Sequence, residues 1–159
     1  MYERILLTLD GSPLAEQALP HAAALAECFK AELILFKVLV PLTSNINLPP
    51  GAVKRAEAAT RELAIEYLDR VAASVQEKGF PIKVVTVTGR PHEEIVRFAE
   101  TEQVDIVVIC TRGHSGISRW LMGSVADRVA RSVNVPVLLV RASKDSRDAE
   151  RISDDEPLI

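Results

Sequence analysis

Residues 5–13 read ILLTLDGSP and combine a short apolar run, a turn and the start of a helix. The apolar run over residues 5–9 stops at Asp10, as is typical of a strand that is covered on both faces. Ser12 followed by Pro13 indicates a helix N-cap and the first helical residue. The N-terminal segment therefore predicts a buried strand that passes directly into a helix.

The alternation of strand and helix continues along the chain. We expect strands over residues 5–9, 33–40, 82–87, 104–109 and 137–140, and helices over residues 12–29, 53–78, 91–99 and 124–133. Strands separated by helices imply parallel pairing with right-handed crossovers. The predicted fold class is α/β: an open, doubly wound, five-stranded parallel sheet with helices on both faces, Rossmann-like or flavodoxin-like.

Two of the predicted helices carry more specific expectations. Pro20 lies well inside the first helix and has no backbone N–H, so we expect a kink there. Cys28, on the same helix, is expected to be a small core residue. The second helix is expected to end near Gly79, and the residues with helical spacing on its inward face are Val53, Ala56, Thr60, Leu63, Tyr67, Val71 and Val75.

Composition limits the class of protein. The 159 residues are 48% hydrophobic and 26% charged, which is ordinary for one globular domain and excludes a wholly disordered chain. Aromatic residues make up only 4%, so the core must be aliphatic and base-stacking surfaces are not expected. The net charge of −3 argues against a nucleic-acid-binding protein.

The charge is concentrated at the C-terminal end. Residues 142–159 contain three basic and six acidic residues and few apolar ones. We expect a single domain over residues 1–141 and a disordered acidic tail over residues 142–159. The apolar runs are too short for a signal peptide or a membrane span, so we expect a cytoplasmic protein with no membrane association.

Two predicted strand-to-helix loops have the chemistry of a ligand site. Residues 10–12 follow the first strand, and residues 110–116 (CTRGHSG) follow the fourth. Open parallel sheets bind ligands outside the carboxyl ends of their strands, where the strand order reverses. If both loops flank one such point, the first and fourth strands are neighbours and the strand order is 3-2-1-4-5.

Gly123 and Ser124 mark the beginning of the helix that follows this second loop. Ser124, with Asp127 three residues later, is a capping pattern, so the helix is expected to start at Ser124. The unpaired amides of a helix N-terminus suit a phosphate, and Arg112 and His114 would add positive charge. Other interpretations remain open at this point, because Ser124 can be a plain N-cap and Asp10 can simply form a turn.

The combined pattern resembles the universal stress protein (UspA) family. Residues 110–113 (CTRG), the pair at 123–124 nine residues later and residues 134–141 (NVPVLLVR) carry the resemblance. Residues 5–12 and 89–95 (GRPHEEI) are similar to that family as well. In its ATP-binding branch the motif is glycine, two residues, glycine, nine residues, glycine, then Ser or Thr. Cys110 stands here in place of the first glycine.

The resemblance implies which residues touch a nucleotide. Asp10 and the end of the second strand, near Val38, would hold the adenine and ribose. The phosphates would lie against Gly113, Gly123, Ser124 and Val125. The expected nucleotide-binding set is Thr8, Asp10, Val38, Cys110, Thr111, Arg112, Gly113, His114, Gly116, Gly123, Ser124 and Val125.

The expected function is an ATP-binding regulatory module that acts in the stress response without efficient catalysis, with Mg²⁺ accompanying the nucleotide. The sequence has no GxxxxGK[ST] loop, serine triad or metal-ligand spacing that would indicate another chemistry. A nucleotide-free interaction protein and a slow ATPase remain alternatives. The uncharged last strand, residues 135–140, is expected at a sheet edge and favours a homodimer.

Overall fold

Five parallel strands form the centre of the computed structural model, which describes residues 1–41, 50–111 and 123–142. The strands are β1 (Arg4–Thr8), β2 (Glu32–Leu39), β3 (Ile82–Thr88), β4 (Ile106–Thr111) and β5 (Val137–Arg141). Their order in the sheet is β3-β2-β1-β4-β5, and every pairing is parallel. The predicted fold class and strand order are confirmed.

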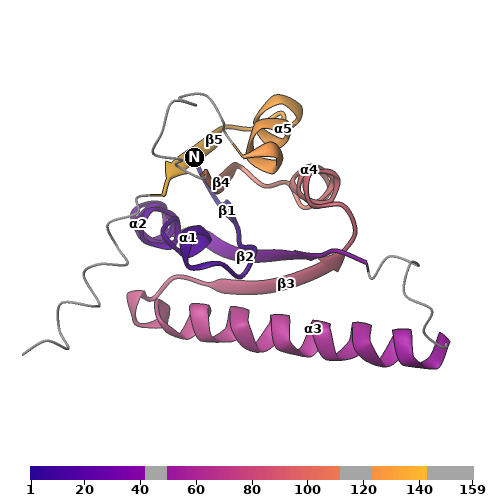
Figure 1. Ribbon diagram of the computed structural model, residues 1–159. Coiled ribbons are helices and arrows are strands. Elements are labelled where there is room, and N and C mark those ends of the chain that lie inside the picture. The colour runs from indigo at the N-terminus through magenta and orange to yellow at the C-terminus, as the bar shows by residue number, and fades with distance from the viewer. Residues whose placement is uncertain (42–49, 112–122, 143–159) are drawn as a thin grey trace, which may run out of the picture.

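Helices cover both faces of this sheet (Figure 1). The helices are α1 (Pro13–Glu16), α2 (Leu19–Phe29), α3 (Pro50–Ala73), α4 (Pro91–Thr101) and α5 (Ser124–Ser132), with a short 3₁₀ turn η1 (Gln76–Lys78) after α3. Helices α2 and α3 pack on one face, and α4 and α5 pack on the other. No helix in the described ranges is both long enough and apolar enough to cross a membrane.

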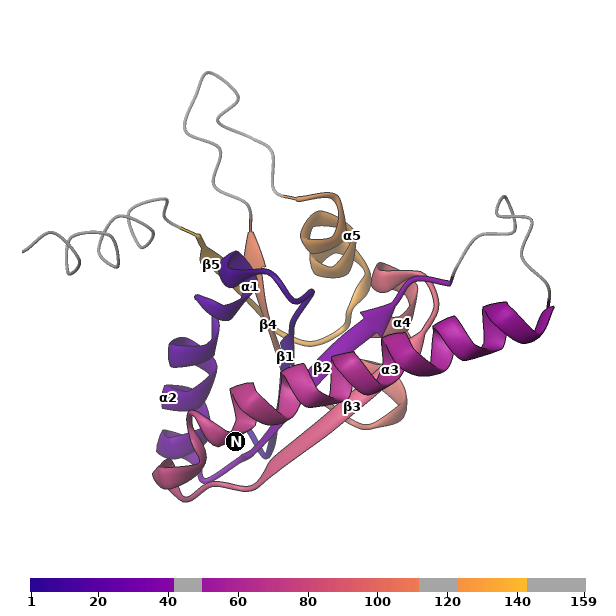
Figure 2. The same cartoon turned by 60° about the horizontal axis from the view of Figure 1, so that its bottom comes forward.

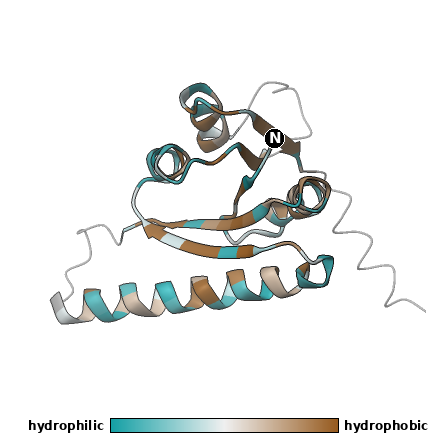
Figure 3. Ribbon diagram, turned by 180° about the vertical axis from the view of Figure 1, so that it is seen from behind, coloured by the Kyte–Doolittle hydropathy of each residue, from teal (hydrophilic) through white to brown (hydrophobic). Residues whose placement is uncertain are grey.

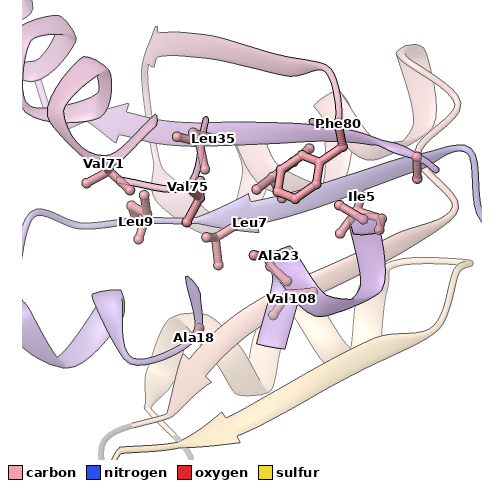
Figure 4. Packing of buried hydrophobic residues seen from close by; sticks show 14 of the residues in the cluster. Ile5, Leu7, Leu9, Ala18, Ala23, Leu35, Val71, Val75, Phe80 and Val108 are labelled. Carbon is pink, nitrogen blue, oxygen red and sulfur yellow. The ribbon is translucent and has the colours of Figure 1, made fainter. Parts of the chain in front are cut away.

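Side-chain alternation along the strands builds one core on each face. Ile5 and Leu7 of β1 point toward α2 and α3, together with Leu35 of β2 (Figure 4). Leu6 of β1 and Phe36 of β2 point toward α4 and α5. All of these side chains are buried. A strand that is apolar on both faces is therefore the local property that requires helices on both sides of the sheet.

The first helical segment is broken at Pro20 instead of kinked, so that expectation is corrected. Helix α1 ends at Glu16, and α2 begins at Leu19 with Pro20 in its first turn. Proline cannot donate a hydrogen bond inside a helix, but the first-turn amides need no intrahelical partner. The helix therefore ends before Pro20 and starts again around it.

Cys28 is exposed on α2, so its predicted place in the core is wrong. Ala22, Ala23 and Ala26 form the buried face of this helix. Alanine at these positions lets the α2 backbone approach the sheet closely, and Leu19, Leu25 and Phe29 pack half-buried at the margins of this face. Both cysteines are free.

Helix α3 packs on the sheet with part of the face that its sequence spacing predicts. Ala64, Leu68, Val71 and Val75 are buried, whereas Leu63 is 66% exposed. Figures 1 and 2 show that the N-terminal turns of α3 run past the ends of the strands, and Figure 3 shows hydrophilic and hydrophobic residues alternating along the helix. The spacing therefore identified Tyr67, Val71 and Val75 correctly, whereas Leu63 is wrong because its neighbour Ala64 takes the buried position.

Two leucines on α3 allow a matched test of this packing. Replacement of Leu68, which is 0% exposed, by alanine leaves a cavity against the sheet and is expected to cost about 2–5 kcal/mol of unfolding free energy. Leu63→Ala on the exposed face is expected to change stability by less than about 0.5 kcal/mol. Urea unfolding followed by circular dichroism measures both, and equal losses would contradict the assigned face.

Candidate functional site

A cavity of about 470 Å³ lies at the carboxyl ends of β1 and β4. The direct pairing of these two strands brings together segments that lie about a hundred residues apart in the chain (Figure 2). Residues from β1, the following turn, α1, β2, α4, β4 and α5 line it: Thr8, Leu9, Asp10, Ser12, Leu14, Ala15, Phe36, Val38, Pro91, Ile95, Ile109, Cys110, Thr111, Gly123, Ser124, Val125 and Ala126.

The turn after β1 forms one rim of the cavity. Oδ1 of Asp10 accepts a hydrogen bond of 2.8 Å from the backbone N–H of Ser12. The Ser12 hydroxyl in turn accepts a bond of 3.2 Å from the backbone N–H of Ala15 and caps α1. Gly11 between them has φ +92°, a left-handed conformation that favours glycine. The Asp10 and Ser12 side chains therefore both define this turn and line the cavity.

The N-terminus of α5 forms a second rim. Gly123 is the N-cap residue, with extended backbone, and Ser124 is the first helical residue. The prediction that Ser124 begins the helix is confirmed, but the N-cap position belongs to Gly123, which has no side chain to make a capping bond. Asp127 instead accepts a bond of 3.0 Å from Nε of Arg131, one turn along the helix. The expected capping interaction with Asp127 is therefore wrong, since Arg131 is the partner of that carboxylate.

No atom of the described fold lies within 4 Å of where a Cβ on Gly123 would be. Among the described residues, the backbone of Gly123 therefore faces open space at the cavity, and the first-turn amides of α5 begin beside it. Such amides carry partial positive charge and suit an anion.

Cys110 and Thr111 end β4 at the floor of the cavity. The Cys110 side chain is half-buried and packs against the core beneath α2, and the space of the cavity remains open beside it. Burial raises the pKa of the Cys110 thiol, and the negative charge of Asp10 adds to this effect. At neutral pH Cys110 is therefore a neutral, weakly polar part of the wall.

The remaining wall is apolar and was missed by the sequence reasoning. Phe36 lies two residues before Val38 on the same face of β2, and Pro91 and Ile95 share one face of α4. Two-residue strand alternation and the i, i+4 spacing of the helix were the signals that could have found them. The cavity thus has an apolar side at β2 and α4 and a polar side at the two rims.

Eight of the residues expected to bind nucleotide lie around this one cavity: Thr8, Asp10, Val38, Cys110, Thr111, Gly123, Ser124 and Val125. Arg112, Gly113, His114 and Gly116 lie outside the described residues. Within the described ranges, no three His, Cys, Asp or Glu side chains are grouped so that they could hold a metal ion.

Comparison with known proteins identifies the family. Residues 1–141 match the model of the Universal stress protein family, and the chain belongs to that family. The universal stress protein MJ0531 of Methanocaldococcus jannaschii is 34% identical over 145 residues, which are 91% of this chain and 85% of that protein. MJ0577 of the same organism is 33% identical over 155 residues, and the match covers 89% of this chain and 96% of that protein. The resemblance seen in the sequence is confirmed.

Solved structures agree with this assignment. The structure of MJ0577 matches with a TM-score of 0.77 at 33% identity and covers 91% of this chain and 99% of that one. A universal stress protein in complex with cAMP matches with a TM-score of 0.65 at 27% identity, and the match covers 89% of this chain and 98% of that one.

The two cysteines are expected to differ in reactivity. Because the thiolate is the nucleophile, the half-buried Cys110 with its raised pKa should react with iodoacetamide several-fold more slowly than exposed Cys28 at mildly alkaline pH. Mass spectrometry of the timed adducts measures the difference, and unfolding in urea should remove it. Faster labelling of Cys110 in the folded protein would contradict the description of the cavity floor.

Proposed function

We propose that this protein binds ATP, with Mg²⁺, in the cavity between β1 and β4 and acts as a regulatory module without efficient turnover. The observation that carries the proposal is that the Asp10–Ser12 turn and the N-terminus of α5 line the same cavity. A nucleotide needs an apolar slot for its base, acceptors for its ribose and anion-binding amides for its phosphates. All three are found around this cavity.

The size and polarity of the cavity fit a nucleotide. Its volume of about 470 Å³ lies in the range of small-molecule sites, roughly 300–1,000 Å³. Phe36, Val38 and Ile95 offer an apolar surface for an adenine ring. The Asp10 carboxylate at the rim is an acceptor suited to ribose hydroxyl groups. These residues would hold the nucleoside half of the ligand.

The phosphates would lie at the N-terminus of α5. The amides of Ser124 and Val125 belong to the first turn of the helix, where intrahelical acceptors are lacking. A hydrogen bond to a charged group contributes about 1.5–3 kcal/mol, so two or three such bonds are a substantial part of nucleotide affinity. Arg112, Gly113, His114 and Gly116 belong to the same proposal through their place in the family motif.

Mg²⁺ would arrive with the nucleotide, because this ion binds proteins mainly through substrate phosphates and its own waters. In the described part of the wall the ionisable side chains are Asp10 and Cys110, and the raised pKa of Cys110 keeps it neutral. This wall favours holding a nucleotide over activating water. The relative crystallised with cAMP further supports a nucleotide as the ligand class.

The nucleotide-free alternative depends on Cys110 blocking the cavity in place of a motif glycine. Cys110 packs against the core beside a cavity that stays open, which favours binding. The slow-ATPase alternative depends on Asp10, and loss of phosphate release in an Asp10→Asn variant would support it.

MgATP is expected to raise the melting temperature, because a ligand that binds only the folded state stabilises it. The gain is about 2.7 kcal/mol at a ligand concentration of roughly a hundred times Kd. Gly123→Val should abolish the shift while the protein still folds, since the space for a side chain there is open in the fold. Differential scanning fluorimetry measures both effects.

Ser132→Val is the matched control, because this exposed residue lies at the other end of α5. It should retain the full MgATP shift. Absence of a shift in the parent protein at millimolar MgATP, with no nucleotide in its denatured supernatant, would retire the proposal.

We further propose that two copies pair through β5. This strand lies at the edge of the sheet, and Leu139 is 38% exposed on it. Residues 137–140 of this strand carry no charge, and an uncharged, partly exposed edge favours pairing with its twin around a two-fold axis.

Leu139→Lys is expected to shift the protein from dimer to monomer, because it places a charge on the proposed interface. Light scattering coupled to size exclusion at micromolar concentration measures the mass. Leu63→Lys, on the exposed face of α3, is the control and should stay dimeric. A monomeric parent protein would refute the dimer.

A further inference from the structure

We infer that Lys37 is a positioning residue for the nucleotide site. Its side chain does not line the cavity, but its ammonium group holds the Asp10–Ser12 turn in place from the opposite face of the sheet. The expected effect of Lys37 on nucleotide affinity rests on the proposed function. The turn contact itself is a property of the fold.

The alternation of β2 puts Lys37 behind the cavity. Phe36 and Val38 line the cavity, so the side chain between them points to the other face, toward α3. Nζ of Lys37 lies 5.6 Å from the ring centroid of Tyr67 on α3. It also donates a hydrogen bond to the backbone carbonyl oxygen of Asp10. One strand therefore supplies the wall of the cavity and a support for its rim.

Gly11 fits against this ammonium group. A Cβ on Gly11 would lie 2.9 Å from Nζ of Lys37, closer than side-chain atoms pack. The left-handed φ of +92° at Gly11 turns the backbone so that the Asp10 carbonyl faces Lys37. On the other side of the turn, the Asp10 carboxylate accepts the Ser12 amide. The lysine and the carboxylate thus hold the turn from two directions.

The surroundings of Lys37 indicate that its ammonium group is held in one position. A surface lysine normally keeps its ammonium group in water, whereas this one is partly withdrawn between the turn and an aromatic ring. Burial lowers the pKa of Lys37, and the negative charge of Asp10 opposes that change. Burial and the negative charge of Glu16 raise the pKa of Tyr67, so its ring stays neutral beside the ammonium.

The contact also bears on the charge at the rim. Asp10 lines a cavity proposed to accept a polyphosphate, and an isolated carboxylate there would repel it. Lys37 lies on the opposite side of the same residue and offsets part of that charge without occupying the cavity. Loss of the ammonium group would therefore weaken polyphosphate binding in two ways: the turn would lose a hydrogen bond, and the rim would become more negative.

The test compares Lys37→Met, which keeps the length and loses the donor, with Lys37→Arg, which keeps both donor and charge. By calorimetry, the Kd of the methionine variant for MgATP should be about tenfold higher than that of the parent protein. The Kd of the arginine variant should lie within about twofold of the parent value. Lys37→Leu, which also has neither donor nor charge, gives the same comparison if the methionine variant does not fold.

Lys83→Met is the matched control. Lys83 lies on the neighbouring strand β3, with Nζ 6.0 Å from the ring centroid of Phe98 and 3.2 Å from Oε2 of Glu102. It is a lysine over an aromatic ring in a similar setting, but it does not contact the cavity or its rims. Its removal should leave the Kd for MgATP within about twofold of the parent.

A second readout separates the inference from the proposed function. Without nucleotide, Lys37→Met should shift the backbone amide resonances of Gly11 and Ser12, and Lys83→Met should not. If the parent does not bind MgATP but these resonances shift, the proposed function fails and the turn contact stands. Unshifted amides, equal affinity of the methionine variant and the parent, or an arginine variant as weak as methionine would overturn the inference.

Discussion

The parallel pairing of β1 with β4 is the contact on which the site depends. These strands are distant in the chain, and their adjacency reverses the direction in which the sheet is built. The carboxyl ends of both strands therefore lie at the same edge of the sheet. The cavity between Asp10 and the start of α5 is the space left at that point. Nothing local to either loop creates it.

The same sheet explains why residues outside the cavity matter to it. β2 is covered on both faces, so successive side chains lie in different surroundings. Phe36 and Val38 form the apolar wall of the cavity, and Lys37 contacts the turn from the opposite face of the sheet. Hydrogen bonds from Lys37 and Ser12 determine the path of the backbone near Asp10. The wall of the cavity and a support for its rim therefore come from opposite faces of one strand.

The expectations that failed have different physical causes. Pro20 was expected to kink a helix and instead lies in the first turn of a new one, where its missing backbone N–H costs no hydrogen bond. Leu63 has the spacing of an inward residue, but its neighbour Ala64 takes the buried position. Asp127 pairs with Arg131, one turn along the same helix, and not with the helix start. Two of these choices were local to one segment, whereas the buried face of α3 depended on the distant strands that it packs against.

The amino-acid sequence by itself determined the elements, the strand order and most of the cavity's polar residues, because these follow from apolar runs, turn residues and the family motif. The tertiary structure alone decided which face of α3 is buried, which apolar residues complete the cavity and where the Lys37 ammonium group goes. Those properties depend on which side chains, distant in the sequence, come into contact across the sheet. The spacing of residues along the chain does not specify these contacts.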